Sequence, residues 1–456
     1  MGKDIKNVIF ITIDALRADH LAFIGYKRDT SPFLGKLAEK GTIFTMAFSN
    51  APHTFGSFPS IFSSDYPVLG SSYTIEGRTI LQEILNEEGY QTAAFHSNPY
   101  LSRYYKYDRG FNYFEDYFPS ISPENKNQPQ TKTSMKRKIT DKLMRKHNIF
   151  FNIFALLRTI ANLERKNVPY VNALDVTDDV LSWAENRSRN PFFLWVHYMD
   201  THSPPVYPHL LNDIEGPPVN KHELKERLHR INPSQAVCVN YLADRINKYD
   251  FRIRFVDHAI ETLFSRLDNG ILDSSLIIIT ADHGDEFLDH GHFGHRPKLY
   301  DELIHVPLVI KGPGIPQGKK VDKIVQHLDI APTILDLLNI PIPKSFLGEN
   351  IFEVTKREGV ISETSSEVDK IEIDLNKLKV AYRTKDWKYI YCKDADDELY
   401  NLKIDPKETK NLLSSQKEKA EEFKSRILQH IAMKEKTFRI LNEKEKIKKL
   451  KIGRRI

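Results

Sequence analysis

The stretch NVIFITID, residues 7–14, is a run of mainly β-branched and aromatic residues that ends in a carboxylate, Asp14. A continuous apolar run of this length predicts a parallel strand that is covered on both faces. Residues 276–280 (LIIIT), 192–196 (FFLWV) and, more weakly, 91–95 repeat the pattern. Each of these runs is also followed by polar side chains that can bind a ligand. Asp282 and His283 follow residues 276–280, His202 follows residues 192–196, and Asn98 follows residues 91–95.

Helical patterns at 31–40, 80–88 and 176–184 lie between these runs, so the sequence predicts an α/β sheet. In open α/β sheets the functional site lies outside the carboxyl ends of the strands. The polar groups at the ends of these strands, which come from distant positions in the sequence, should therefore meet at one edge. Two carboxylates and an imidazole can form the shell of a divalent metal. Taken singly, each residue could instead be an ordinary turn or helix-cap residue.

A candidate nucleophile lies in residues 52–64, PHTFGSFPSIFSS. Pro52 breaks the preceding element, and we expect a helix to begin near Gly56 or Ser57. Thr54 would then lie just before a helix N-terminus, where free amides favour an anionic group. The alternative is that Thr54 and Ser57 are simple N-caps.

Composition limits the class of protein. The chain has 456 residues and a net charge of +5, which is too mild to indicate nucleic-acid binding. Two cysteines cannot form a disulfide framework or a four-thiolate zinc site. There is no apolar run of about 18 residues and no signal-peptide pattern, so we expect a cytoplasmic protein.

Residues 132–165 form a segment with a basic first half and an apolar second half, and we expect a helical insertion there. It could pack on the core as a lid, or it could lie at a membrane surface and contact anionic lipid. The second possibility would make the protein peripherally membrane-associated. The sequence leaves the oligomeric state open.

Five motifs in order resemble the sulfatase family of the alkaline phosphatase superfamily, over roughly residues 5–412. They are NVIFITIDALR from Asn7, TFGSFPSIFSS from Thr54, TADHGDEF from Thr280 with LYDELIHVPLVIKGPG after it, HLDIAPTILDLL from His327, and ELYNLKIDPKETKNL from Glu398. The resemblance implies a large, mixed and mainly parallel sheet flanked by helices. It assigns residues 1–345 to a catalytic domain and 346–456 to a small α+β subdomain with a basic tail. Within that subdomain we expect a hairpin at 380–391 and a helix at about 416–434.

The resemblance also implies roles for individual residues. Asp14, Asp282 and His283 would bind one metal ion, with Thr54 as nucleophile and fourth ligand. This ligand set admits Mn²⁺, Zn²⁺, Mg²⁺ or Ca²⁺. His202 aligns with a histidine that contacts the ester or its leaving group. In two-metal relatives a second ion is present, which here would involve Asp200 and His202.

Arg296 aligns with a substrate-binding lysine of the family, and Lys298 is a competing candidate. The family's Lys-Trp-His motif is missing, and Asn98 stands near that place, where it could bind an ester oxygen or cap a turn. His295 could be an acid-base group or support a ligand, or the loop that carries it could be a plain surface loop.

The nucleophile position departs from the sulfate-cleaving members, which carry a cysteine or serine that is oxidised to formylglycine. The β-carbon of Thr54 carries a methyl group and cannot yield that aldehyde, and Phe58 replaces the motif's arginine. We therefore expect a metal-dependent hydrolase of anionic esters that acts on phosphate mono- or diesters or phosphonates rather than on sulfates. The alternatives are a true sulfuric ester hydrolase, a phospho-group transferase acting on a lipid or glycan, and a non-catalytic binding protein.

Overall fold

The computed structural model describes residues 4–118, 170–202, 214–231, 238–354, 356–365 and 371–453, so the insertion expected at 132–165 lies outside it. None of the helices in these ranges has both the length and the apolar character that crossing a bilayer requires.

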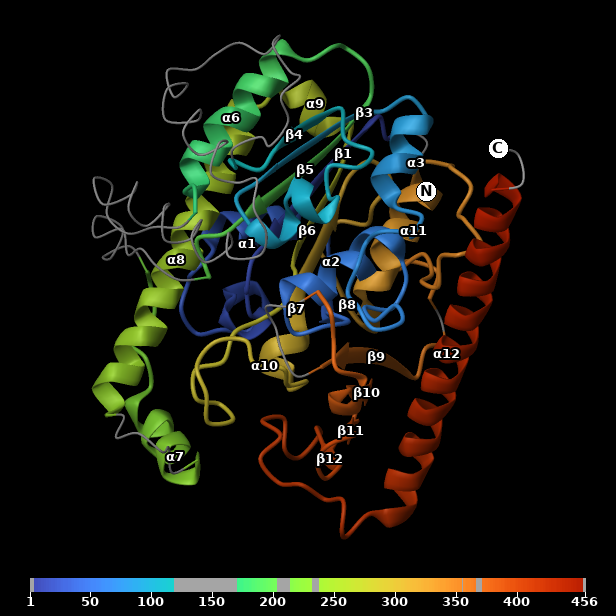
Figure 1. Cartoon of the computed structure of the whole chain (residues 1–456). Helices are drawn as coiled ribbons and strands as arrows, with labels where there is room; N and C mark the ends of the chain where they lie inside the picture. The colour runs from blue at the N-terminus through green and yellow to red at the C-terminus, as the bar shows by residue number, and fades with distance from the viewer. Residues whose placement is uncertain are drawn as a thin grey trace, which may run out of the picture.

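An eight-stranded sheet forms the centre of the molecule, with the strand order β4-β3-β5-β1-β6-β7-β2-β8 (Figure 1). β1 pairs in parallel with β5 on one side and with β6 on the other. β7 runs antiparallel to both of its neighbours, which makes the sheet mixed but mainly parallel. The strands are β1 (Asn7–Ile13), β2 (Thr42–Phe48), β3 (Gln91–His96), β4 (Tyr113–Glu115), β5 (Phe192–Tyr198), β6 (Ser275–Ala281), β7 (His305–Lys311) and β8 (Lys319–Gln326). The four strands predicted from the apolar runs are confirmed.

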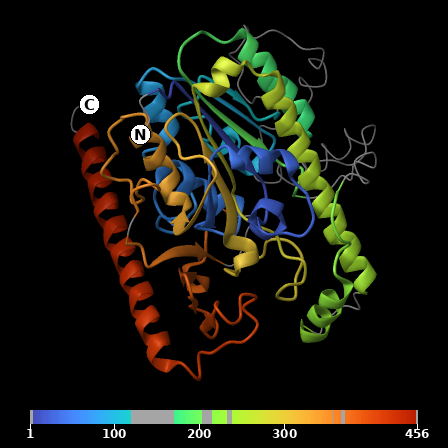
Figure 2. The same ribbon diagram turned by 180° about the vertical axis from the view of Figure 1, so that it is seen from behind.

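Helices flank this sheet, as expected (Figure 1). One group packs α1 and α6 against α8, and a second packs α2 against α3 and α11. Figures 1 and 2 both show α8 and α12 on opposite sides of the molecule. The helices are α1 (Pro32–Glu39), α2 (Thr54–Ser63), α3 (Leu81–Glu87), α6 (Ala173–Asn186), α7 (Lys221–Ile231), α8 (Val239–Arg266), α9 (Asn269–Asp273), α10 (Asp301–Ile304), α11 (Ile330–Leu337) and α12 (Lys417–Gly453).

The core holds α2 rigidly against the sheet. Every residue of β1 and β6 is buried, as expected for strands covered on both faces. Phe62 of α2 packs edge-on against Phe10 of β1, and Phe58 contacts Trp195 of β5. Each buried phenylalanine contributes about 1.5–3 kcal/mol of hydrophobic free energy. The start of α2 is therefore fixed relative to the strand ends.

A second, four-stranded antiparallel sheet follows in the order β12-β11-β10-β9. Its strands are β9 (Gly359–Thr364), β10 (Lys379–Thr384), β11 (Trp387–Cys392) and β12 (Glu398–Asn401). The expected hairpin is confirmed as β10 and β11. α12 packs on this sheet through Phe423 and Ile427, and it continues to Gly453 rather than ending near residue 434. The domain boundary expected at 345/346 stays a prediction.

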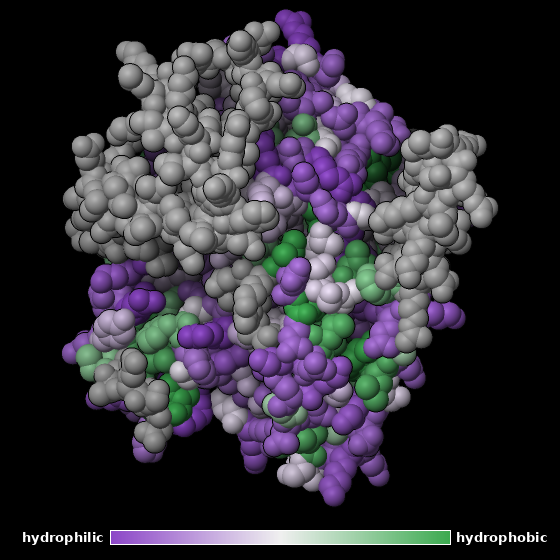
Figure 3. All heavy atoms as spheres, viewed as in Figure 1, coloured by the Kyte–Doolittle hydropathy of each residue, from purple (hydrophilic) through white to green (hydrophobic). Residues whose placement is uncertain are grey.

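On the face shown in Figure 3, the described surface is mainly hydrophilic, with hydrophobic residues scattered between polar ones. Scattered apolar residues are normal on a folded protein and do not mark a binding surface.

Candidate metal and nucleophile site

The pairing of β1 with β6 brings three potential metal ligands together. In this parallel pair Ile13 lies opposite Ala281, so Asp14 and Asp282 leave the sheet side by side. One ligand atom from each of Asp14, Asp282 and His283 lies within 4.8 Å of the other two, and all three residues are fully buried. The described ranges contain no other group of three such residues, which leaves Asp200 and His202 without a second-metal cluster.

Neighbouring backbone groups orient these ligand atoms. Oδ1 of Asp282 accepts hydrogen bonds from the amides of Ala15 (3.1 Å) and His283 (2.9 Å), so Oδ2 is the oxygen turned to the site. Nδ1 of His283 lies 2.7 Å from the carbonyl oxygen of Gly284. A carbonyl can only accept, so Nδ1 carries the proton and Nε2 keeps a lone pair. Fixing the tautomer in this way is typical of metal-binding histidines.

Gly284 allows the chain to turn tightly after the two ligands. A Cβ at this position would lie 2.0 Å from the carbonyl oxygen of Glu302, and the amide of Gly284 donates to the carbonyl of Leu303 at 2.8 Å. The backbone after β6 therefore touches the backbone of α10 directly, which positions Asp282 and His283.

Thr54 is the first residue of α2, so this helix begins two residues earlier than the sequence suggested. Its hydroxyl donates to Oδ2 of Asp282 at 2.9 Å and lies 3.5 Å from Nε2 of His283. The N-cap is His53 rather than Thr54: Nδ1 of His53 accepts a hydrogen bond from the amide of Gly56. The Thr54 hydroxyl is thus free of capping and faces the triad.

Asn98 and His197 complete the surroundings of Asp14. Nδ2 of Asn98 donates to Oδ2 of Asp14 at 3.0 Å and lies 3.5 Å from Oγ1 of Thr54. The side-chain oxygen of Asn98 also accepts from the amide of Tyr100, so Asn98 is both a cap and a site residue. Nε2 of His197 lies 3.3 Å from the same Oδ2 of Asp14.

The two carboxyls of the triad have opposite electrostatic environments. Burial alone would raise the pKa of Asp14, but the positive charge of His202 and the hydrogen bond to His197 together hold it below its usual range. Burial, and then the negative charge of Asp14, raise the pKa of Asp282. Two buried carboxyls this close are unfavourable unless a cation is present.

These observations fit a divalent metal. Oδ1 of Asp14 is buried and has no hydrogen-bond partner among the described residues, although a buried carboxylate oxygen is costly to leave unsatisfied. Two carboxylate oxygens, one imidazole nitrogen and the nearby Thr54 hydroxyl form a donor set that divalent ions accept. Asp14, Asp282 and His283 would hold the ion.

His202 and His295 extend the site along one side. The ring centres of His283 and His295 lie 4.5 Å apart, and those of His295 and His202 lie 5.0 Å apart. Nδ1 of His202 lies 3.3 Å from the hydroxyl of Tyr170. Burial is the main cause that holds the pKa of His295 well below its usual value. His295 is therefore neutral beside the triad.

The two candidate anion-binding cations differ in their surroundings. Arg296 is exposed and forms no ion pair within the described ranges. Nζ of Lys298 lies 3.0 Å from the buried carboxylate of Glu286 and 2.8 Å from the carbonyl of His290. The charge of Lys298 is thus already balanced, whereas no described residue balances that of Arg296.

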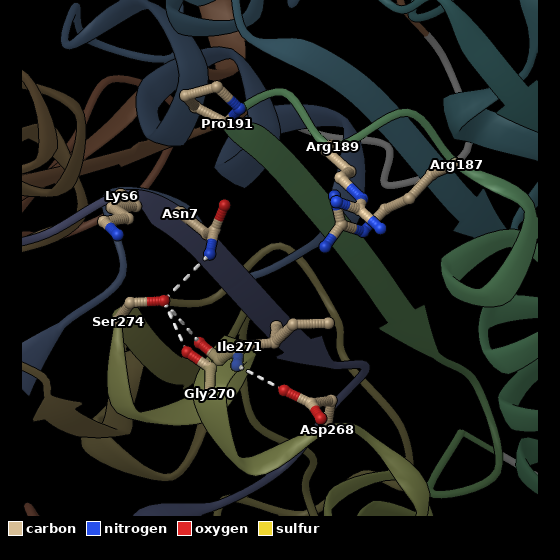
Figure 4. Close-up of a pocket in the computed structure, with 9 residues that line it drawn as sticks. All are labelled: Lys6, Asn7, Arg187, Arg189, Pro191, Asp268, Gly270, Ile271 and Ser274. Carbon is tan, nitrogen blue, oxygen red and sulfur yellow. Dashed lines mark hydrogen bonds between the residues drawn. The ribbon is translucent and has the colours of Figure 1, made fainter.

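A surface depression of about 250 Å³ lies at the opposite edge of the sheet (Figure 4). Lys6, Arg187 and Ser274 are among its lining residues, and they lie near the starts of β1, β5 and β6. Asp14 and Asp282 follow the other ends of β1 and β6, so this depression is not part of the candidate site.

Sequence reasoning assigned no role to two residues that the structure places here. His53 directly precedes Thr54, and this position was the available signal for a capping residue. His197 was visible as a polar residue at the end of a strand, but nothing in the sequence indicates that its ring turns toward Asp14. Both depend on side-chain directions that follow from the packing.

Comparisons with known proteins agree with this geometry. The family described as Sulfatase matches residues 6–340, and the family described as N-sulphoglucosamine sulphohydrolase, C-terminal, matches residues 288–437. Arylsulfatase K of Bos taurus is 23% identical over 456 residues, covering 90% of this chain and 78% of that protein. The uncharacterized sulfatase YidJ of Escherichia coli (strain K12) is 32% identical over 164 residues, covering 35% of this chain and 32% of that protein.

Two solved structures share the fold. The phosphonate monoester hydrolase of Agrobacterium radiobacter has a TM-score of 0.67 at 18% identity, covering 94% of this chain and 96% of that one. The putative sulfatase YidJ of Bacteroides fragilis has a TM-score of 0.68 at 18% identity, covering 97% and 98%. Since the Sulfatase family matches well over half of the chain, this protein belongs to the sulfatase family of metal-dependent ester hydrolases.

Proposed function

We propose that this protein hydrolyses phosphate mono- or diesters or phosphonates through a covalent intermediate on Thr54. The observation that carries the proposal is the position of the Thr54 hydroxyl at the start of α2, 2.9 Å from Asp282 and 3.5 Å from His283. A hydroxyl that is held beside a metal-binding triad and is not used as a cap is suited to act as a nucleophile.

The chemistry of threonine favours phosphorus over sulfur. Formylglycine hydrate can expel sulfate by collapsing to an aldehyde, but the β-carbon of Thr54 carries a methyl group and cannot reach that state. A sulfate ester on threonine would need water to attack sulfur. A phosphate ester on threonine can be released by water at phosphorus, which is a common route for covalent phospho-intermediates.

The chain's own residues and water account for the proton and bond changes. Thr54 Oγ1 releases its proton to water and forms a bond to phosphorus, while the bond from phosphorus to the leaving oxygen breaks. His202 donates a proton to that leaving oxygen. Because Nδ1 of His202 already contacts the hydroxyl of Tyr170, the donating nitrogen is Nε2. Water then attacks phosphorus and gives a proton back to His202, while the bond to Thr54 breaks and Thr54 Oγ1 takes a proton from solvent.

When bound, the divalent ion supplies a Lewis acid that lowers the pKa of the threonine hydroxyl and neutralises charge on the substrate. The developing charge on the equatorial oxygens is also met by the amides of Thr54 and Phe55, the first two of α2, because the next two amides already donate to His53. Arg296 is favoured over Lys298 as the cation that binds these oxygens, because Lys298 already pairs with Glu286. Asn98 and His295 are proposed to line the substrate side of the same site.

Sulfuric ester hydrolysis is the second candidate, and the names of the curated relatives favour it. Arylsulfatase K aligns with 90% of this chain. The fold does not decide between the two chemistries, since solved structures described as sulfatases and as phosphonate monoester hydrolases both share it. Transfer of the phospho-group to an alcohol acceptor on a lipid or glycan would use the same threonine ester.

The test is a parallel assay with 4-nitrophenyl sulfate, 4-nitrophenyl phosphate, 4-nitrophenyl phenylphosphonate and bis(4-nitrophenyl) phosphate. Each ester is assayed with Mn²⁺, Zn²⁺, Mg²⁺ and Ca²⁺, for the wild type, Thr54→Ala and Thr54→Ser. We expect metal-dependent turnover of a phosphorus ester that Thr54→Ala loses by at least 1,000-fold and Thr54→Ser largely keeps, since serine retains the nucleophilic oxygen.

Mass spectrometry of the quenched reaction should find the phospho-group on the peptide that contains Thr54. Turnover of the sulfate ester above all others, lost in Thr54→Ala, would establish the second candidate instead. Turnover of a phosphorus ester that survives in Thr54→Ala would contradict the role of Thr54.

A further inference from the structure

The segment that leads into the nucleophile is bound to the second sheet. Residues 49–53 connect β2 to α2, and the end of β9 lies against them. The amide of Glu363 donates to the carbonyl of Asn50 at 2.8 Å, and the hydroxyl of Ser362 donates to the carbonyl of Ser49 at 2.6 Å. Asn50 returns a side-chain hydrogen bond to the carbonyl of Ile361 at 2.7 Å. The approach to Thr54 is therefore held by a strand some 310 residues further along the chain.

His53, the neighbour of Thr54 in the chain, also contacts the second sheet. Its Nδ1 accepts from the amide of Gly56 at 3.2 Å, so Nδ1 has a lone pair and the proton lies on Nε2. Nε2 lies 3.4 Å from Oγ1 of Thr364, the last residue of β9, and can donate to it. The ring is 1% exposed and packs edge-on against Tyr73, whose hydroxyl accepts from the amide of Ser365.

α12 in turn holds the end of β9. The carboxylate of Glu363 lies 2.6 Å from Nε2 of His430 and 2.5 Å from Nζ of Lys434, both on α12. The same carboxylate accepts from the amide of Val68 at 3.1 Å. A buried carboxylate with three donors is a rigid anchor, because moving it would leave charged groups unpaired.

We propose that His53 is a positioning residue for Thr54 and that the second sheet controls it through Thr364. By capping the first turn of α2 while resting on β9, His53 sets where the Thr54 hydroxyl points relative to Asp282 and His283. The inference rests on the proposed function, in which Thr54 is the nucleophile. A displacement of about 1 Å at a reacting group can cost roughly 100-fold in rate.

The geometry also predicts which kinetic constant responds. His53 and Thr364 are buried behind the first residue of α2, and neither is among the residues proposed to bind the substrate. Loosening them should misdirect the attacking oxygen without weakening substrate binding. The effect should therefore fall on kcat rather than on KM.

The experiment compares Thr364→Val with Thr364→Ser in the full-length protein. Thr364→Val keeps the shape and removes the acceptor; Thr364→Ser keeps the hydroxyl. Thr42→Val is the matched control, because Thr42 is equally buried and its hydroxyl donates to the carbonyl of Pro316 at 2.7 Å, away from His53. Each variant is measured for kcat and KM on the best ester of the panel, for Tm, and for amide hydrogen exchange of peptides covering residues 49–60.

We expect Thr364→Val to lower kcat at least tenfold with KM within twofold, and to speed exchange at Gly56 and Ser57. Thr364→Ser should recover most of the loss, and Thr42→Val should lower Tm comparably while leaving kcat within twofold. His53→Asn is a second variant, because asparagine still caps a helix but is too short to reach Thr364. It should lose kcat as Thr364→Val does, with a lower Tm because the buried imidazole that packs on Tyr73 is truncated.

The proposal is overturned if Thr364→Val leaves both kcat and the exchange of residues 49–60 unchanged, or if Thr42→Val lowers kcat equally. If the wild type turns over no ester, the proposed function fails. The exchange measurement still decides this inference in that case: faster exchange in Thr364→Val but not in Thr42→Val supports the coupling, and equal exchange overturns it.

Discussion

The hydroxyl of Thr54 donates to Oδ2 of Asp282 at 2.9 Å, which joins the first residue of α2 to the first residue after β6. This contact relates two residues that are 228 positions apart in the chain. It places a nucleophile candidate directly beside the carboxylate whose other oxygen is fixed by backbone amides.

Metal binding should stabilise the fold through the triad. A ligand that binds only the native state at 100 times its Kd adds about 2.7 kcal/mol of unfolding free energy. We expect a chelator to lower Tm and inactivate the wild type, and the added divalent ion to restore both. Asp14→Asn should lose the Tm response because it removes a charged ligand from the site. Asp268→Asn is the control, since Asp268 only caps α9 and asparagine caps equally well. An unaltered metal response in Asp14→Asn would contradict the assignment of Asp14 as a ligand.

His202 should matter most when the leaving oxygen needs a proton. With phenyl phosphate, whose leaving group is a poor one, we expect His202→Ala to lower kcat/KM roughly 100-fold or more. With 4-nitrophenyl phosphate, which leaves readily as an anion, the loss should be under tenfold. The measurement is the dependence of kcat/KM on leaving-group pKa in both proteins. Equal losses with both esters would assign His202 to binding rather than to proton donation.

Gly284→Ala should destabilise the protein and impair the site. The new Cβ would lie 2.0 Å from the carbonyl oxygen of Glu302, so the backbone that carries Asp282 and His283 must shift. Overpacking of this kind costs about 1–3 kcal/mol. Gly35→Ala is the control: Gly35 is helical with no atom within 4 Å of a new Cβ, and alanine there should be neutral or stabilising. Urea unfolding and metal titration of both variants check the prediction; a wild-type metal affinity in Gly284→Ala would show that the tight turn is not needed.

Stability should fall between about pH 6.5 and pH 9 because of His290. Burial alone would lower the pKa of His290, but its hydrogen bond to Glu302 at 2.6 Å and the charge of that carboxylate raise the pKa to about 9. A histidine whose pKa is raised on folding stabilises the protein fully below its unfolded pKa near 6.5. The stabilisation is lost as the pH rises through about 9, and it amounts to about 3 kcal/mol at most.

The free energy of unfolding of the wild type should therefore decline across this range more steeply than that of His290→Asn. His258→Asn is the control. His258 is half exposed on α8, and its distance of 3.7 Å from the carboxylate of Glu261 makes a weak surface ion pair. Parallel pH profiles for the wild type and His290→Asn would contradict the prediction.

The sequence alone determined the strands of the central sheet and the kinds of group at their ends. An unbroken apolar run such as 7–13 can be stable only between two covering layers, so its place in a parallel sheet follows from composition. The residue at position 54 is likewise a property of the sequence, and its methyl group excludes the formylglycine route whatever the fold. The start of α2 was misplaced by two residues because the capping side chain is an unusual one, His53.

Only the tertiary structure decided which of these groups meet. The register of β1 against β6 sets Asp14 beside Asp282, and this register is fixed by packing across the whole sheet. The pairing of Lys298 with Glu286, and of His53 with Thr364, joins side chains whose directions depend on neighbours far away in the chain. Strand propensity and residue chemistry are local and can be read in sequence. Polar residues can share a metal ion only if they lie within a few ångströms of one another, and long-range packing sets those distances.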